Sequence, residues 1–241
     1  MHRDKYGIIG QIQPDKSVEG GDSACWMGHW IYLTDEKFPY VKTFEKGFGG
    51  YCRHPHPEQT YNGFGAYYKN PWNGCISRDQ FTGVLLAVIK QQDHKAMLRI
   101  MLQHACRAFL FSYNTIKNGT DPKTAKWKLP DLTLFDIWAM ELRGFGKLSW
   151  IFWPLLCVLD IHLLLSAMFD KYFDNDEPDV INAIGKLMVS REYVPTPVSW
   201  LATKFYNKQN LLKRLTAYWG TWRDNPEFIW EFKKKLDKVL G

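Results

Sequence analysis

Apolar positions recur at helical spacing through most of the chain after residue 76. Phe81, Val84, Leu85, Val88 and Ile89 are three or four residues apart, a spacing that brings them to one side of a helix. The same pattern predicts further helices along the chain. They run over 93–117, from 131 to the glycines at 144 and 146, over 178–190, from 196 onward, over 210–219 and from 225 onward. Alternating strand patterns are scarce, so the sequence predicts an all-α fold of about eight antiparallel helices.

Polar residues at the expected helix starts fit known capping patterns. Ser77-Arg78-Asp79-Gln80 has the form of a capping box, in which the side chains of the first and last residue bond to each other's backbone N–H groups. Thr196-Pro197 and Asn225-Pro226 each place a proline at a first helical position. These signals predict helices that begin near residues 78, 197 and 226.

The first 76 residues have a different character. Apart from a helix predicted over Ser23–Leu33, they show little periodicity, and we expect ordered loops there. The chain is therefore predicted to form a single domain over 1–241, in which a loop layer (1–76) closes one end of a helical frame (77–241). Short links between the helices favour either an α/α toroid or a plain helical bundle, and no repeat of fixed period is visible.

One apolar run is long enough to raise the question of a membrane. Leu148–Phe169 would span about 33 Å as a helix. It contains Pro154, Asp160, His162 and Ser166, which favour a central buried helix over a membrane span. We expect Asp160 and His162, on different faces of that helix, to be satisfied polar groups of the core.

Charge and cysteine content exclude several classes of protein. The net charge of +6 comes mostly from residues 200–241, where the lysines at 233–235 and 238 are typical of a solvated helix face, and we expect no nucleic-acid binding. The five cysteines form no C-x-x-C pair, so neither a disulfide framework nor a structural zinc site is expected. Nucleotide-binding fingerprints are absent from the sequence, and we expect no cofactor.

Two carboxylates of the loop layer are candidates for catalysis. Asp79 lies at the mouth of the helical frame and Asp22 lies among glycines, where the backbone can approach a ligand closely. If the two faced each other, their separation would distinguish a retaining from an inverting glycosidase. Both positions also suit helix starts, where acidic residues are common without any catalytic role. The expected ligand-binding side chains are Arg53, His54, Asn70, Trp72 and Arg78.

A metal site is a weaker alternative in the same segment. His54 and His56 have His-x-His spacing, which puts two imidazoles on one side of an extended chain. Two ligands do not make a site, and a third would have to come from His29, Asp22 or Asp79. We therefore assign no metal and keep His54 and His56 as candidates.

The succession of polar motifs resembles that of a known group of proteins. Gly20-Gly21-Asp22-Ser23, Arg53-His54-Pro55, Asn70-Pro71 and Ser77-Arg78-Asp79-Gln80 cover the first third of the chain. They look like the motifs of a poorly characterised group encoded by tailed bacteriophages and some bacteria, a resemblance that brings no established reaction with it. It implies a virion protein of the tail or tail fibre, with other virion proteins or further copies of itself as partners and a surface glycan as a ligand.

A looser resemblance supports an alternative function. The loop layer is similar to that of α/α-toroid carbohydrate-active proteins, which is an analogy at the level of the fold. It implies a glycoside hydrolase or lyase in the cytoplasm, with Asp79 and Asp22 as acid and base and with Arg53 or His54 holding the substrate.

Overall fold

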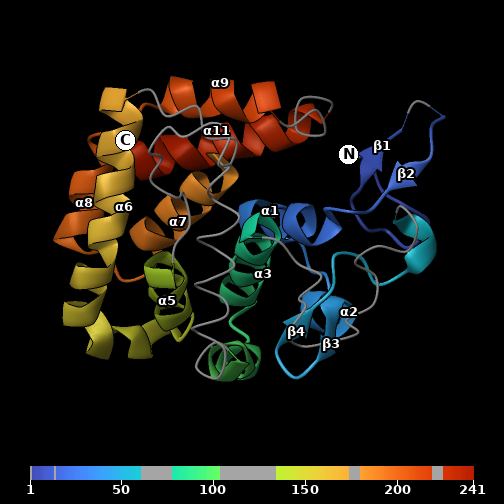
Figure 1. Ribbon diagram of the computed structural model, residues 1–241, viewed down its shortest axis with the longest axis horizontal. Coiled ribbons are helices and arrows are strands. Elements are labelled where there is room, and N and C mark those ends of the chain that lie inside the picture. The colour runs from blue at the N-terminus through green and yellow to red at the C-terminus, as the bar shows by residue number, and fades with distance from the viewer. Residues whose placement is uncertain (1, 14, 61–77, 104–133, 174–179, 219–224) are drawn as a thin grey trace, which may run out of the picture.

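The computed structural model describes residues 2–13, 15–60, 78–103, 134–173, 180–218 and 225–241, and these are mostly helical (Figure 1). The helices are α1 (Ser23–Thr34), α2 (Tyr40–Phe44), α3 (Arg78–Gln91), α5 (Leu134–Arg143), α6 (Trp153–Phe173), α7 (Val180–Glu192), α8 (Pro197–Thr203), α9 (Lys208–Tyr218) and α11 (Pro226–Leu240). Residues 94–103 are also helical, and two short 3₁₀-helices lie at Pro57–Gln59 (η1) and Gly146–Phe152 (η3). The all-α prediction is confirmed, whereas the toroid or bundle arrangement and the single domain remain predictions.

The described part of the loop layer predicted over 1–76, called the amino-terminal layer below, contains more regular structure than the sequence predicted. The helix expected over Ser23–Leu33 is present as α1, but α2 and two hairpins were missed. The hairpins pair β1 (Gln11–Ile12) with β2 (Val18–Glu19), and β3 (Glu45–Gly47) with β4 (Gly50–Tyr51), both antiparallel. Strands of two or three residues are too short for an alternating pattern to show in the sequence.

The centre of the molecule is the crossing of α1 and α3. A Cβ atom on Gly28 would lie 1.9 Å from the carbonyl oxygen of Gly83, and one on Gly83 would lie 2.6 Å from Cys25 Cα. Only glycine permits backbones to approach this closely. Around the crossing, the main hydrophobic cluster joins side chains of the amino-terminal layer to α7 and α11, including Ile9 and Phe232.

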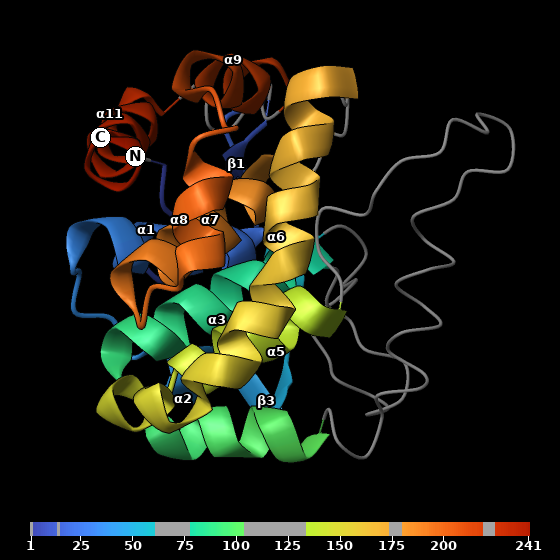
Figure 2. The same ribbon diagram turned by 90° about the vertical axis from the view of Figure 1, so that its left-hand side faces the viewer.

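The apolar run at 148–169 differs from expectation in two ways. It is divided between η3 and α6, because Pro154 suits the first turn of a helix and not its interior. It is also not a central buried helix: α6 lies at one side of the molecule, and Leu155, Val158 and Ile161 are about half exposed, at 48%, 59% and 48% (Figure 2). The burial prediction was wrong because only one side of α6 packs against α5, α7 and α8, and that side includes Asp160 and Ser166, while the exposed side is apolar.

The length and composition of the same run also suit a membrane span. Among the described residues, Gly146–Met168 is the one helical segment long and apolar enough to cross a membrane, with a mean hydropathy of 1.9. A third of it is buried inside the protein.

Candidate functional site

The sequence-predicted site residues Asp22 and Arg53 meet at the amino end of α1. Arg53 Nη1 lies 3.5 Å from Asp22 Oδ1 and 3.4 Å from the Gly21 carbonyl oxygen. The Gln80 amide of α3 donates to the same Asp22 oxygen, at 2.6 Å, and to Gly21 O, at 2.8 Å. We call Asp22, Arg53 and Gln80 the Asp22 cluster.

The Asp22 side chain makes these contacts because it does not cap its own helix. Asp22 is the N-cap residue of α1, yet its carboxylate accepts no hydrogen bond from the first turn. The loop before it is fixed by the backbone, since Gly20 N donates to Gln59 O and Ala24 N donates to Arg53 O. The carboxylate is thereby left to join α1 to the loop of Arg53 and to α3.

Gln80 has a role that the capping-box pattern did not indicate. Its Nε2 reaches the start of α1, as described above, and so ties α3 to the amino-terminal layer. Ser77, the other member of the expected capping box, lies outside the described residues. The helix start predicted near residue 78 is observed, because α3 begins at Arg78.

His54 is held beside the cluster by a buried partner. Its Nε2 lies 2.9 Å from Asp4 Oδ2, and both side chains are buried. The His56 backbone N–H donates to His54 Nδ1 at 3.0 Å. Gly20 packs on the same ring so closely that a Cβ would lie 2.4 Å from His54 Cδ2. Burial lowers the pKa of His54, and the Asp4 carboxylate offsets this only in part.

His56 belongs to a small surface group next to His54. Its ring stacks on Tyr6, with 3.6 Å between the ring centroids. The Tyr6 hydroxyl donates to Glu58, and this bond holds the pKa of the Glu58 carboxyl below its ordinary value. Lys5 lies 3.5 Å from the same carboxylate. The group places an aromatic stack and charged side chains on the surface beside the Asp22 cluster.

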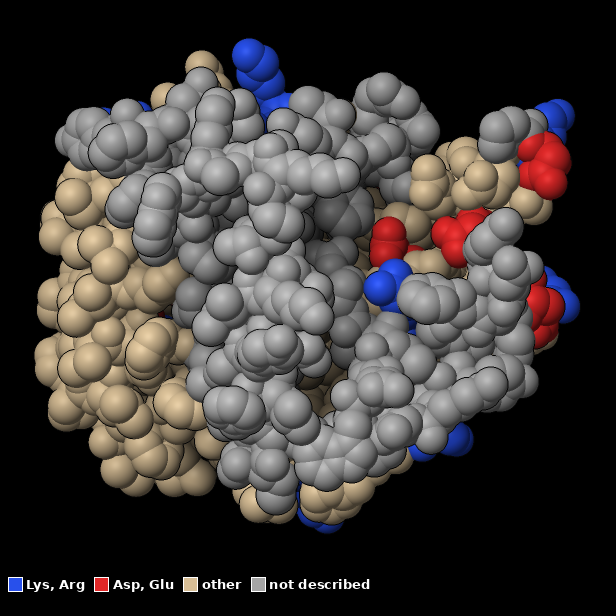
Figure 3. All heavy atoms as spheres, viewed as in Figure 1, with Lys and Arg blue, Asp and Glu red and all other residues tan. Residues whose placement is uncertain are grey.

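The Asp22 cluster is partly open to solvent. The Asp22 side chain is 33% exposed and the Arg53 side chain 21%. Figure 3 shows acidic and basic side chains gathered on the right of the molecule, around β1 and β2, where the surface is notched. The cluster can therefore present a carboxylate, a guanidinium and backbone oxygens to a ligand.

Four other sequence-predicted site residues lie wholly or partly outside the described residues. Asn70 and Trp72 lie outside the described residues. Arg78 and Asp79 form the start of α3, but their side chains are also outside the description, so the separation of Asp22 and Asp79 stays a prediction. His29, considered as a third metal ligand, is buried within α1 and bonds through Nδ1 to Cys25 O at 2.8 Å. Within the described parts of the chain, no three His, Cys, Asp or Glu side chains are arranged to hold a metal ion.

A second polar group lies buried between α5, α6 and α7. Lys186 Nζ is 3.1 Å from Ser166 Oγ and 3.6 Å from Asp136 Oδ1, and His162 Nδ1 is 2.8 Å from Asp136 Oδ2. No sequence pattern groups these four residues, although His162 was expected to be satisfied within the core. Asp136, Lys186 and Ser166 are almost fully buried, so the group links three helices rather than facing a substrate.

Two pockets lie away from the Asp22 cluster. One, of about 470 Å³, is at the opposite end of α1 and is lined by residues that include Asp35, Phe38 and Lys90. The other, of about 340 Å³, lies where α6 and α8 end, and its lining includes Lys171, Lys204 and Asn210. The sequence did not predict either pocket, because each is formed by residues far apart in the chain.

Comparison with the known protein families, with the curated proteins and with the solved structures gives no match for this chain. The sequence patterns and the geometry described above are therefore the basis for a functional proposal.

Proposed function

We propose that the chain is a structural and interaction protein of a tailed-bacteriophage virion, associated with the tail or a tail fibre, whose loop layer contacts a surface glycan. The resemblance of Gly20–Ser23, Arg53–Pro55, Asn70–Pro71 and Ser77–Gln80 to phage-encoded proteins motivates the virion assignment. The proposal names other virion proteins or further copies of the chain as partners.

The observation that carries a binding role is the mutual bonding of the Asp22 cluster. Asp22 Oδ1 accepts from Gln80 and faces Arg53, so the carboxylate helps to hold the loop in place. Side chains fixed in this way make a rigid set of polar groups, which is what sugar hydroxyls need for oriented hydrogen bonds. The Tyr6–His56 stack adds an aromatic surface nearby.

Particle composition and adsorption test the proposal together. A phage that lacks the gene for this chain would be complemented with the wild type, with Arg53→Ala or with Lys46→Ala, an exposed lysine of β3 that serves as the control. We expect mass spectrometry to find the chain in all purified particles. Arg53→Ala particles should adsorb to the host about tenfold more slowly, since hydrogen bonds from a charged group are lost. Particles without the chain would contradict the virion assignment, and equal adsorption would contradict the glycan site.

A carbohydrate-active enzyme is the second candidate, favoured by the partly exposed Asp22 carboxylate, which accepts no capping hydrogen bond from α1. In that case Asp22 and Asp79 act as base and acid on a glycan bound by Arg53 or His54. Turnover of a glycan by the purified chain, lost in Asp22→Asn and kept in the exposed-loop control Asp15→Asn, would favour this function over the first. Unchanged turnover in Asp22→Asn would exclude that mechanism.

A further inference from the structure

One side of the molecule presents an uncovered apolar surface. It is formed by η3, α6 and α8, and Figure 2 shows α6 at the front of this side. Ile151, Val158 and Trp200 are 74%, 59% and 51% exposed. In Figure 3 the left of the molecule, over α5, α6 and α8, is almost free of charged side chains. We call this surface, with Trp150, Ile151, Leu155, Val158, Trp200 and Leu201 as its main exposed side chains, the apolar face.

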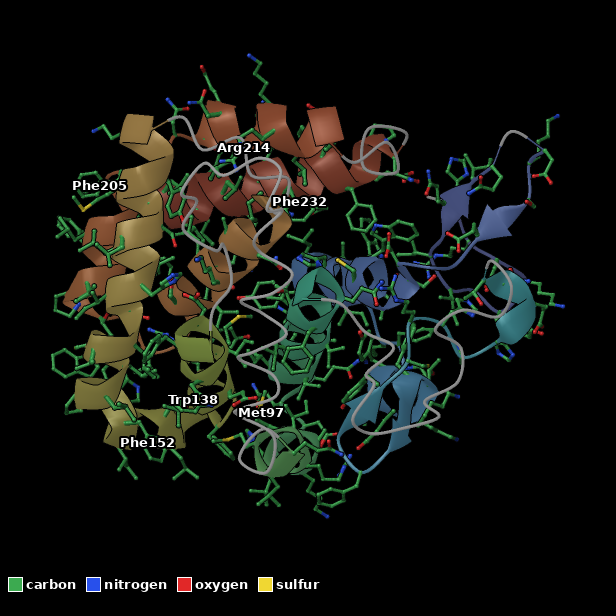
Figure 4. All side chains as sticks on the ribbon, viewed as in Figure 1. Met97, Trp138, Phe152, Phe205, Arg214 and Phe232 are labelled. Atoms are coloured by element: carbon green, nitrogen blue, oxygen red, sulfur yellow. The ribbon has the colours of Figure 1, made fainter. Side chains whose placement is uncertain are left out.

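The apolar face is continuous and elongated. Its α6 residues follow one another at steps of three and four from Leu155 to Leu165, a row about 15 Å long, and Ile151 of η3 precedes them. α8 packs along α6 and adds Trp200 and Leu201 beside that row. In Figure 4, Phe152 and Phe205 lie near the two ends of α6. Soluble proteins rarely expose apolar surface of this extent unless something binds it.

Few charged residues lie in the segments that form the apolar face, and most of them are basic, whereas Asp170 directly precedes Lys171 near the end of α6. Between 144 and 168 and between 193 and 208, the sequence contains one acidic residue, Asp160, which is buried against Arg143. Lys147 at one end and Lys204 at the other are exposed. Lys204 Nζ lies 4.7 Å from the centroid of the Trp200 ring, so an ammonium group borders the aromatic surface directly.

A cationic pocket continues the apolar face at its Lys204 end. This is the pocket of about 340 Å³, whose lining residues include Lys171, Lys204, Asn207 and Asn210. Lys171 also lies 5.3 Å from the Phe205 ring, which brings the ends of α6 and α8 together. An apolar surface that leads into a pocket of cationic and amide donors matches a molecule with hydrocarbon chains and an anionic head.

We propose that the apolar face binds a bilayer surface containing anionic phospholipid, with α6 and α8 lying in the plane of the membrane and a lipid phosphate in the Lys171–Lys204 pocket. Tryptophan and lysine beside an apolar helix face are typical of helices at this depth in a membrane. A second copy of the chain fits less well, because it would bring the same lysines toward the face and no exposed carboxylate from these segments. This inference does not depend on the proposed function.

Vesicle flotation tests it with the full chain. Vesicles of phosphatidylcholine alone are compared with vesicles that also contain phosphatidylglycerol. We expect stronger binding to the second kind and at least a tenfold loss of binding in Ile151→Glu/Val158→Glu. The matched control is Leu98→Glu/Leu102→Glu, which changes two leucines of the helix at 94–103 that are 51% and 46% exposed, and it should bind as the wild type does. Lys171→Gln/Lys204→Gln should weaken binding to phosphatidylglycerol vesicles by about fivefold for each lysine.

Three results would overturn the proposal. Equal binding to both kinds of vesicle would show that an anionic headgroup is not needed for binding. A chain that binds neither kind, and that light scattering shows as a dimer broken by Ile151→Glu/Val158→Glu, would assign the face to a second copy. A chain that binds neither kind and is monomeric would also contradict membrane binding.

Discussion

Burial favours the neutral form of the His54 imidazole, and the Asp4 carboxylate beside it opposes this effect. Nδ1 lies 3.0 Å from the His56 backbone nitrogen and 3.2 Å from the His56 carbonyl oxygen, and Nε2 faces Asp4 Oδ2 at 2.9 Å. The sequence indicated that His54 had a special role, because of the His-x-His spacing, but it could not show which partner it has. Asp4 stands 50 residues away among ordinary charged residues, and only the folded chain brings the two together.

The lowered pKa of His54 predicts that stability falls in acid. The unfolded imidazole titrates near 6.5, and the folded one at a lower pH because burial disfavours its charged form. Between those values the unfolded chain binds more protons, so the free energy of unfolding decreases as the pH falls through 6.5. We expect the melting temperature to drop between about pH 8 and about pH 5.5 in the wild type, and to drop less in His54→Gln.

Circular dichroism at a series of pH values would measure this effect. The control is His94→Gln, which replaces a histidine that contacts Gly144 and Phe145 and leaves the His54–Asp4 contact in place. If His54→Gln and the wild type lost stability in parallel, His54 would not be the group responsible.

At the scale of elements, helix starts could be predicted from local residues but burial could not. Pro197 and Pro226 begin α8 and α11, as the capping patterns indicated, and Thr196 forms a capping box with Ser199. These signals act within one turn of a helix, so the sequence contains them completely. Which side of α6 is exposed depends on where α5, α7 and α8 pack. An apolar run with few polar positions does not indicate this.

The buried pair Arg143–Asp160 joins three elements. Arg143 of α5 makes a two-bond contact with Asp160 of α6, at 2.9 and 2.6 Å, and its Nε donates to Tyr193 O after α7. Thr196, which caps α8, also donates to Asp160. The sequence predicted a satisfied Asp160 but not its partner, because nothing local to α5 marks Arg143 as buried.

Removal of one member of this pair should be costly. Arg143→Met leaves the Asp160 carboxylate buried without its cation, and we expect the free energy of unfolding to fall by about 3–5 kcal/mol. Arg143→Met/Asp160→Leu should cost less than the two single changes added together, with a coupling of about 1–3 kcal/mol. Urea unfolding measures both values. The control is Lys234→Met, which breaks the pair with Glu231 and should lower the free energy of unfolding by less than about 0.5 kcal/mol. A loss as small as this for Arg143→Met would contradict a tightly coupled Arg143–Asp160 pair.

At the scale of the whole molecule, the amino-terminal layer and the helical frame share their interior. The main hydrophobic cluster includes Ile9 and Tyr40 from the layer, Val84 of α3 and Phe228 of α11. Polar contacts cross the same boundary: His2 N donates to Asn225 Oδ1, at 3.1 Å, in addition to the Gln80 bonds at the Asp22 cluster. The sequence suggested a division of the chain at residue 76 because the apolar periodicity changes there. Apolar periodicity identifies single helices but not how they pack, so this division is only a change in local pattern.

Glu192 shows how a single residue connects the two parts. It lies at the end of α7, accepts from the Tyr32 hydroxyl of α1 at 2.8 Å, and is 2.7 Å from Lys235 Nζ of α11. Burial would raise the pKa of its carboxyl, but the hydrogen bonds from Lys235 and Tyr32 outweigh burial and lower it. Lys235, which the sequence placed on a solvated face, is in fact mostly buried by this contact.

A shared interior predicts one cooperative unfolding transition for the whole chain. In native-state hydrogen exchange at increasing urea, amides of α1 and α11 should open with the same free energy, because neither helix keeps its buried partners when the other unfolds. Glu192→Gln should lower that free energy in both helices equally, by about 1–2 kcal/mol, while the control Lys234→Gln, whose side chain is 71% exposed, should change neither appreciably. Opening of residues 2–60 at lower urea than α11, or a loss confined to one helix in Glu192→Gln, would mean that the layer and the frame are separate units and that the single-domain prediction is wrong.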